Sequence, residues 1–120
     1  MYHSLFFLDL YLTGSLEEFL PPPPFTFNEV DQRDVVPERA YTKQELRTYL
    51  LHCRAKCRTT IEGLTDERAA VRCRFPWMDI SVLELLFYNA RHVQHHAGQL
   101  NLILRQKTDS APPRWVKQAT

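Results

Sequence analysis

Two histidines four residues apart, His92 and His96, lie in a long amphipathic segment and are the side chains of this chain best suited to chemistry. Residues four apart on an α-helix lie one turn above each other, with Cβ atoms about 6 Å apart, so both imidazoles can reach one metal ion. His95 points to one side because successive residues rotate by about 100°, and a His92/His95 pair fits the rest of the face less well. Spacing alone leaves two interpretations open: a metal site, or histidines that are hydrogen-bonded to neighbours or to water.

The histidines share their helical line with further polar residues. Steps of three and four residues trace one nearly straight line through Leu85, Asn89, His92, His96, Gln99 and Ile103. The middle four members of this line are polar. A polar patch within an apolar stripe costs free energy unless its groups have partners. The pattern therefore predicts that this face of the helix is used for binding or hydrogen bonding.

Hydrophobic periodicity and capping signals predict the elements that must position this face. Apolar residues at helical spacing predict amphipathic helices over residues 2–13, 42–63 and 81–107. The first should end near Gly14, which suits a C-terminal cap. The second and third begin with the capping boxes Thr42-Lys-Gln-Glu45 and Ser81-Val-Leu-Glu84. The fold class expected from these segments is all-α, with three main helices.

Irregular chain connects the helices. Residues 14–41 contain a run of four prolines and are predicted to form a long crossover, while residues 108–120 form an irregular tail. Residues 64–78 are expected to be a connector with one short helical turn, and no strand pair is predicted. Gly98 lies inside the third helix and predicts a close approach by a neighbouring helix. The whole chain, residues 1–120, is expected to form a single domain.

Composition excludes several classes of function. The formal net charge is +1 and the charges are dispersed, so we expect no nucleic-acid partner. The apolar opening segment has no Lys or Arg before it, carries Asp9 and is shorter than the roughly 20 residues of a membrane span, so it is taken as a core helix. Three cysteines without a secretory pattern indicate reduced thiols in a cytoplasmic protein. A second metal site at Cys53 and Cys57, four residues apart, is not favoured.

The string His92-Val-Gln-His-His-Ala-Gly-Gln-Leu100, followed by Leu104-Arg-Gln106, resembles the last helix of the DinB/YfiT-like family. The opening segment Tyr2-His-Ser-Leu-Phe-Phe-Leu-Asp-Leu-Tyr-Leu12 is similar to the family's second helix, whose early histidine is the remaining metal ligand. The resemblance implies an up-down four-helix bundle that holds a divalent metal, most often zinc or nickel, through His3, His92 and His96. It places His95 outside the metal triad. Three imidazoles would leave one coordination position open.

The chain departs from the family pattern in one respect that bears on assembly. The family's first helix, which precedes the helix with the early histidine, has no counterpart here. Three helices would leave an apolar groove uncovered, so we expect a homodimer or another form of self-association.

The resemblance also implies a function, although the reaction stays open. Related proteins include thiol-dependent transferases and an isomerase that use low-molecular-weight thiols, so a metal-dependent transferase or hydrolase with a small-molecule substrate is one expectation. Gln99, Asn89 and His95 are candidates for hydrogen bonds around the ligands or to a substrate. The alternative is a non-enzymatic stress-related or interaction protein in which the bundle and the metal are structural or vestigial.

Overall fold

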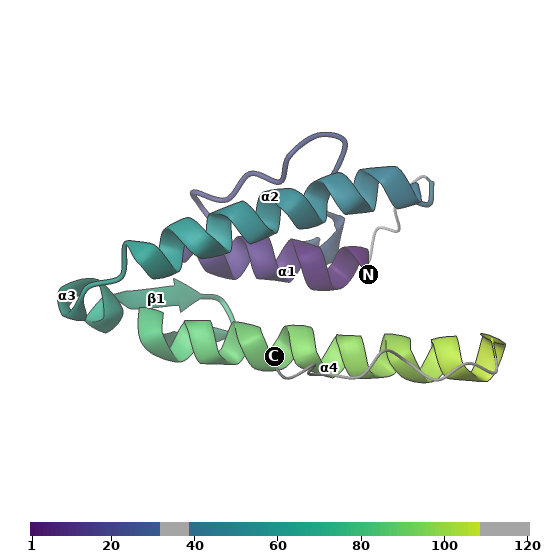
Figure 1. The fold of residues 1–120 in the computed structure, drawn as a ribbon. Coiled ribbons are helices and arrows are strands. Elements are labelled where there is room, and N and C mark those ends of the chain that lie inside the picture. The colour runs from purple at the N-terminus through teal and green to yellow at the C-terminus, as the bar shows by residue number, and fades with distance from the viewer. Residues whose placement is uncertain (32–38, 109–120) are drawn as a thin grey trace.

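The computed structural model describes residues 1–31 and 39–108, and these residues form a mainly helical fold with three main helices and a small hairpin. Figure 1 shows the central helix α1 lying between α2 and α4. The elements in chain order are α1 (Tyr2–Thr13), a 3-10 helix η1 (Asn28–Val30), α2 (Lys43–Glu62), α3 (Asp66–Ala70), β1 (Arg72–Phe75), β2 (Met78–Ser81) and α4 (Val82–Thr108). The three helices predicted from periodicity are confirmed, as is a short helical turn in the connector.

Local signals set the helix ends. Gly14 ends α1 in the left-handed conformation with φ of 84°, which favours glycine because it has no Cβ. The side chain of Thr42 accepts a hydrogen bond from the Glu45 backbone N–H, and the Glu45 carboxylate accepts one from the Thr42 backbone N–H, which completes the predicted capping box of α2. Ser81 and Glu84 make the same reciprocal pair before α4.

The absence of a strand pair was a wrong prediction. β1 and β2 pair antiparallel, with Arg72 opposite Ser81 and Phe75 opposite Met78. Residues alternate between exposed and buried along β1, so Cys73 and Phe75 enter the core. Each strand has only four residues, and the two-residue turn lacks the Asn-Gly or Asp-Gly signal that identifies a hairpin from sequence.

Packing around α1 makes the core. One cluster of buried side chains joins α1 to the hairpin and α4, and it consists of Phe6, Leu10, Tyr11, Phe19, Cys73, Phe75 and Leu85. A second cluster joins the other face of α1 to α2, and it consists of Leu5, Phe25, Tyr49 and Cys53. Both clusters include an aromatic residue of the crossover. The crossover is therefore packed against the helices over part of its length, and it brings η1 close to the N-terminal end of α1.

A buried ion pair links α1 to α2. The side chain of Asp9 is 1% exposed and accepts a hydrogen bond from Lys56 Nζ at 2.6 Å and from the Tyr49 hydroxyl at 3.0 Å. Lys56 also donates to the Thr13 hydroxyl at 2.6 Å. A buried carboxylate needs such partners, because an uncompensated charge in the core is strongly destabilising. This network fixes α1, and with it His3, relative to α2.

Three further expectations concern parts of the chain outside the core. Among the described residues, and apart from Gly98's two chain neighbours and the helix's own nearby backbone, no heavy atom lies within 4 Å of a Cβ built at Gly98, so the predicted close approach by a neighbouring helix is wrong. The predicted tail beyond residue 108 lies outside the described residues. Among the described residues, no helix is both long enough and apolar enough to cross a membrane.

Candidate metal centre

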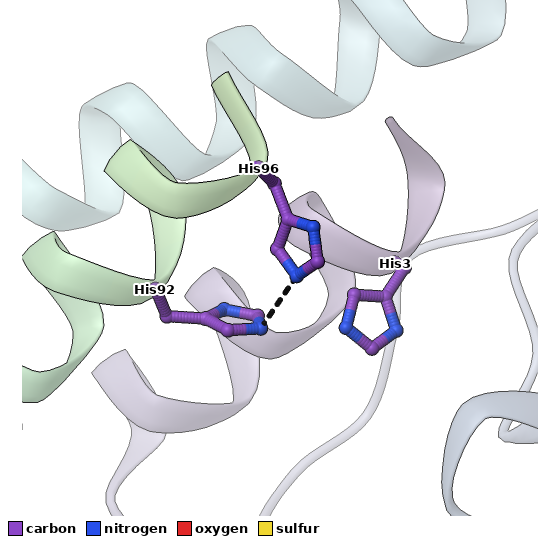
Figure 2. Close-up of side chains that lie close together, drawn as sticks. All are labelled: His3, His92 and His96. Atoms are coloured by element: carbon purple, nitrogen blue, oxygen red, sulfur yellow. Dashed lines mark hydrogen bonds between the residues drawn. The ribbon is translucent and has the colours of Figure 1, made fainter. Parts of the chain in front are cut away.

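The structure brings His3 and the pair His92/His96 together at the N-terminal end of α1. One nitrogen from each ring lies within 4.8 Å of the nitrogens of the other two. The Nε2 atoms of His92 and His96 are 3.1 Å apart, and the His3 ring centroid is 5.3 Å from that of His92 and 4.8 Å from that of His96. Figure 2 shows the three side chains turned toward one point from two helices. This cluster could hold a metal ion.

Helical geometry explains how the chain makes this arrangement. His92 and His96 lie one turn apart on α4, so their rings meet edge to face, with centroids 4.6 Å apart, on the face that meets α1. His3 lies in the first turn of α1, and the packing of α1 on α4 brings its ring next to the rings of His92 and His96. Among the described residues, this is the one group of three His, Cys, Asp or Glu side chains close enough to share an ion.

The local environment keeps His92 neutral. Burial, together with the neighbouring His96 and His3, lowers the pKa of His92 to about 4. The imidazole is therefore uncharged at neutral pH and offers a lone pair. A neutral imidazole is the form that binds metal ions, since protonation removes the donor.

Hydrogen bonds hold the Nδ1 atoms of two of the rings, those of His3 and His96. The Glu29 carboxylate lies 2.6 Å from His3 Nδ1, and Gln99 Oε1 lies 2.8 Å from His96 Nδ1. A carboxylate or amide oxygen only accepts, so each contact places the proton on Nδ1 and leaves the lone pair on Nε2. The two Nε2 atoms fit a divalent metal, because both rings are already in the tautomer that presents Nε2 to the centre.

Gln99, Asn89 and His95, which the sequence suggested as neighbours of the site, lie in different surroundings. Gln99 contacts His96 as described above. Asn89 is buried and donates from Nδ2 to the Leu8 carbonyl at 3.2 Å, while its Oδ1 has no partner among the described residues. His92 Nδ1 is likewise buried without such a partner. His95 is exposed, with its ring centroid 5.1 Å from that of His96.

A comparison with protein families matches residues 1–100 to the DinB superfamily. This chain belongs to the DinB superfamily. The match includes all three histidines of the cluster and every element from α1 to the middle of α4. Searches of curated proteins and of solved structures find no match to this DinB-superfamily chain.

A pocket of about 340 Å³ opens beside the histidines of the DinB-like chain. Its lining includes His3 and His92 together with Phe7, Tyr11, Glu29, Val30, Trp77 and Tyr88. Trp77 reaches the pocket from the hairpin turn and contacts Phe7 with ring centroids 6.4 Å apart. Sequence reasoning missed both Glu29 and Trp77. The cluster is thus bordered by an aromatic pocket of a size that suits part of a small molecule.

Proposed function

We propose that this DinB-superfamily protein binds one divalent metal ion, zinc or nickel, through His3, His92 and His96, and uses it as a thiol-dependent transferase or a hydrolase. The convergence of three imidazole nitrogens within 4.8 Å beside a pocket carries the proposal. Imidazole ligands suit zinc and nickel. Three protein ligands leave one coordination position for a substrate, which is typical of catalytic rather than structural zinc sites.

The proposed chemistry divides between the ion and the chain. The ion, when bound, supplies Lewis acidity and lowers the pKa of a coordinated thiol or water. The aromatic walls of the pocket, formed in part by Phe7 and Trp77, hold the apolar part of a small-molecule substrate or of a low-molecular-weight thiol. Gln99 orients the His96 ring through its Nδ1 contact. The three cysteines are free, in keeping with a cytoplasmic location, where thiols stay reduced.

Elemental mass spectrometry on untagged protein tests the metal site. We expect about one transition metal per chain in the parent after zinc or nickel loading, and loss of that metal in His3→Ala, His92→Ala and His96→Ala. His95→Ala is the matched control, because His95 neighbours the cluster but is exposed and lies outside it. Metal retained by all three ligand variants, or absent from the loaded parent, would refute the proposal.

Loss of metal without loss of fold separates catalysis from a structural role. The alternative function is a stress-related or interaction protein in which the metal only stabilises the bundle. An open site should release its metal to a chelator while the circular dichroism spectrum stays helical, whereas a structural site couples metal loss to unfolding. The side chain of His3 is 43% exposed, which favours the open site. Turnover of thiol-transfer or hydrolysis substrates by the reloaded protein then establishes the enzyme.

We also propose that the protein forms a homodimer through a groove between α2 and α4. The groove has a volume of about 590 Å³ and is mainly apolar. Its lining is Leu8, Leu12, Cys57, Ile61, Leu86, Asn89, Ala90, Val93, Gln94 and Ala97. An exposed apolar surface of this kind marks an interaction site.

The spacing of apolar residues on α4 favours a second copy of the chain as the occupant. One stripe alternates steps of four and three residues, and it consists of Leu86, Ala90, Val93, Ala97, Leu100 and Leu104. This is the seam of a coiled coil, and an antiparallel pair of such helices is self-complementary about a two-fold axis. Figure 1 shows the last turns of α4 extending past the end of α1, where Leu100 and Leu104 are 43% and 46% exposed.

Light scattering after size exclusion tests the dimer. We expect twice the chain mass for the parent and the chain mass for Val93→Lys, which places a charge in the centre of the stripe. Arg91→Lys, at an exposed position of the same helix outside the stripe, is the control. A parent that remains monomeric at about 100 μM, a concentration at which even micromolar dimers form, would refute the proposal.

A further inference from the structure

Glu29 contacts the proposed metal site from the crossover, a segment without helical periodicity in the sequence. Its carboxylate lies 2.6 Å from His3 Nδ1, across 26 residues of chain. The Glu29 side chain is 21% exposed and the His3 side chain 43% exposed, so the contact is partly shielded from water. An exposed ion pair between flexible side chains would contribute little. The contact between Glu29 and His3 differs because the backbone of the segment that carries Glu29 is held in place.

Several contacts fix the segment that carries Glu29. The backbone of η1 is closed by hydrogen bonds from Val30 N–H to the Phe27 carbonyl at 3.1 Å and from Asp31 N–H to the Asn28 carbonyl at 3.3 Å. Val30 packs against the core cluster around α1. Just before η1, the Thr26 carbonyl accepts a hydrogen bond at 2.7 Å from the hydroxyl of Tyr2, the neighbour of His3. The crossover is therefore tied to the turn of α1 that carries His3.

The direction of the contact decides which His3 nitrogen is available. An ionised carboxylate has no proton to donate, so Nδ1 carries the proton and Nε2 of the neutral ring carries the lone pair. Figure 2 shows one nitrogen of the His3 ring facing His92 and His96 and the other pointing away from them. The nitrogen that contacts Glu29 is the outer one, and the free lone pair faces the centre.

We propose that Glu29 is the positioning residue for His3: its carboxylate holds the Nδ1–H tautomer and the ring orientation that present Nε2 to the metal. The inference rests on the proposed three-histidine metal site and adds the crossover to it. Carboxylates in this position also raise the basicity of a ligating imidazole, and their loss typically weakens metal binding by 10-fold to 100-fold. The Nδ1 atom of His96 contacts the neutral amide of Gln99, on its own helix. Among the described residues, His3 is therefore the ligand whose Nδ1 contact comes from a distant segment.

Cobalt(II) titration followed by visible absorption measures the expected effect on metal affinity. We expect Glu29→Ala to weaken Co²⁺ binding about 10-fold to 100-fold relative to the parent. Glu29→Gln should restore most of the affinity, because its amide oxygen still accepts from Nδ1–H. Glu17→Gln, an exposed carboxylate in the same crossover, is the control and should bind as the parent does. The helical circular dichroism and the melting temperature of the metal-free variants should stay close to those of the parent.

The tautomer of His3 gives a second readout that needs no metal. Long-range proton–nitrogen correlation NMR at about pH 8, where an ordinary imidazole is neutral, should show the Nδ1–H form in the parent and its loss in Glu29→Ala. A parent that binds no Co²⁺ but shows this tautomer would overturn the proposed function and leave the role of Glu29 standing. Unchanged affinity and tautomer in Glu29→Ala would overturn the inference alone. An altered Co²⁺ spectrum in Glu29→Gln, with affinity as low as in Glu29→Ala, would identify Glu29 as a direct ligand and also overturn it.

Discussion

Replacement of Lys56 by methionine tests whether the buried ion pair holds α1 against α2. The change removes the ammonium group that lies 2.6 Å from the Asp9 carboxylate, 1% exposed, while Tyr49 still donates a hydrogen bond at 3.0 Å and His52 Nε2 stays 3.4 Å away. Removal of one partner from a buried pair typically costs about 3–5 kcal/mol. We expect about 3 kcal/mol, at the low end of this range, because the Lys56 side chain is 29% exposed and water can partly replace it. Methionine keeps most of the aliphatic contact.

Chemical denaturation followed by circular dichroism measures this loss. For a chain of this size, about 3 kcal/mol corresponds to a fall in melting temperature on the order of 10 °C. Arg58→Met is the matched control on the exposed side of α2 and should change stability by less than about 0.5 kcal/mol. Asp9→Asn combined with Lys56→Met should recover part of the loss, because the buried charge is removed. A Lys56→Met protein as stable as the parent would show that the pair is not what holds the two helices together.

Three further predictions concern stability and reactivity. Gly98→Ala should raise the free energy of unfolding by up to ~1 kcal/mol in urea, because no other part of the described chain comes within 4 Å of the added Cβ; a less stable variant would contradict this. The Val93→Lys variant, in which the proposed dimer is broken, should be modified by brief maleimide treatment at Cys57, which is partly buried, before Cys53, because burial raises the Cys53 pKa to about 12; peptide mapping that finds equal labelling would disprove it. Hydrogen bonds from Arg39 lower the pKa of Glu45 to about 2 from an ordinary value of 4.5. As the pH falls, the unfolded chain therefore takes up this proton at a higher pH than the folded chain does. The stability advantage of the parent over Glu45→Gln should be full above about pH 4.5 and vanish toward pH 2. Denaturation experiments across that range would find the same difference in the free energy of unfolding at every pH if the contact were absent.

The helical part of the fold was predictable because its signals are local. Apolar spacing marked the three main helices, and the capping boxes beginning at Thr42 and Ser81 marked two starts to within a residue. The metal cluster was predictable in part, since the spacing of His92 and His96 follows from helical geometry alone. His3 came from family resemblance, because no local rule relates residues at opposite ends of a chain.

The features that were missed depend on tertiary contacts. The hairpin consists of four-residue strands that are stabilised by burial of Cys73 and Phe75 against α1, and a pattern of four residues is too short to identify a strand. Glu29 lies in irregular chain, where no period predicts which way a side chain points. Gly98 was expected to mark a helix contact, but the glycine lies on a face of α4 where no other described element comes within 4 Å of its Cβ position. Local sequence carries no information about which faces remain uncovered.

The positions of the three histidines in the chain have a consequence for folding. A metal ion shared by His3 and His92 joins residues that lie far apart in the 120-residue chain, so in the metal-bound form that we propose it closes a loop of roughly 90 residues. A crosslink of that span removes conformational freedom from the unfolded chain worth about 4–5 kcal/mol in the chain-entropy model of disulfides. The ion would thus act as a reversible crosslink that cannot form until the last helix has been synthesised. Its binding would show that the first and last helices have come together.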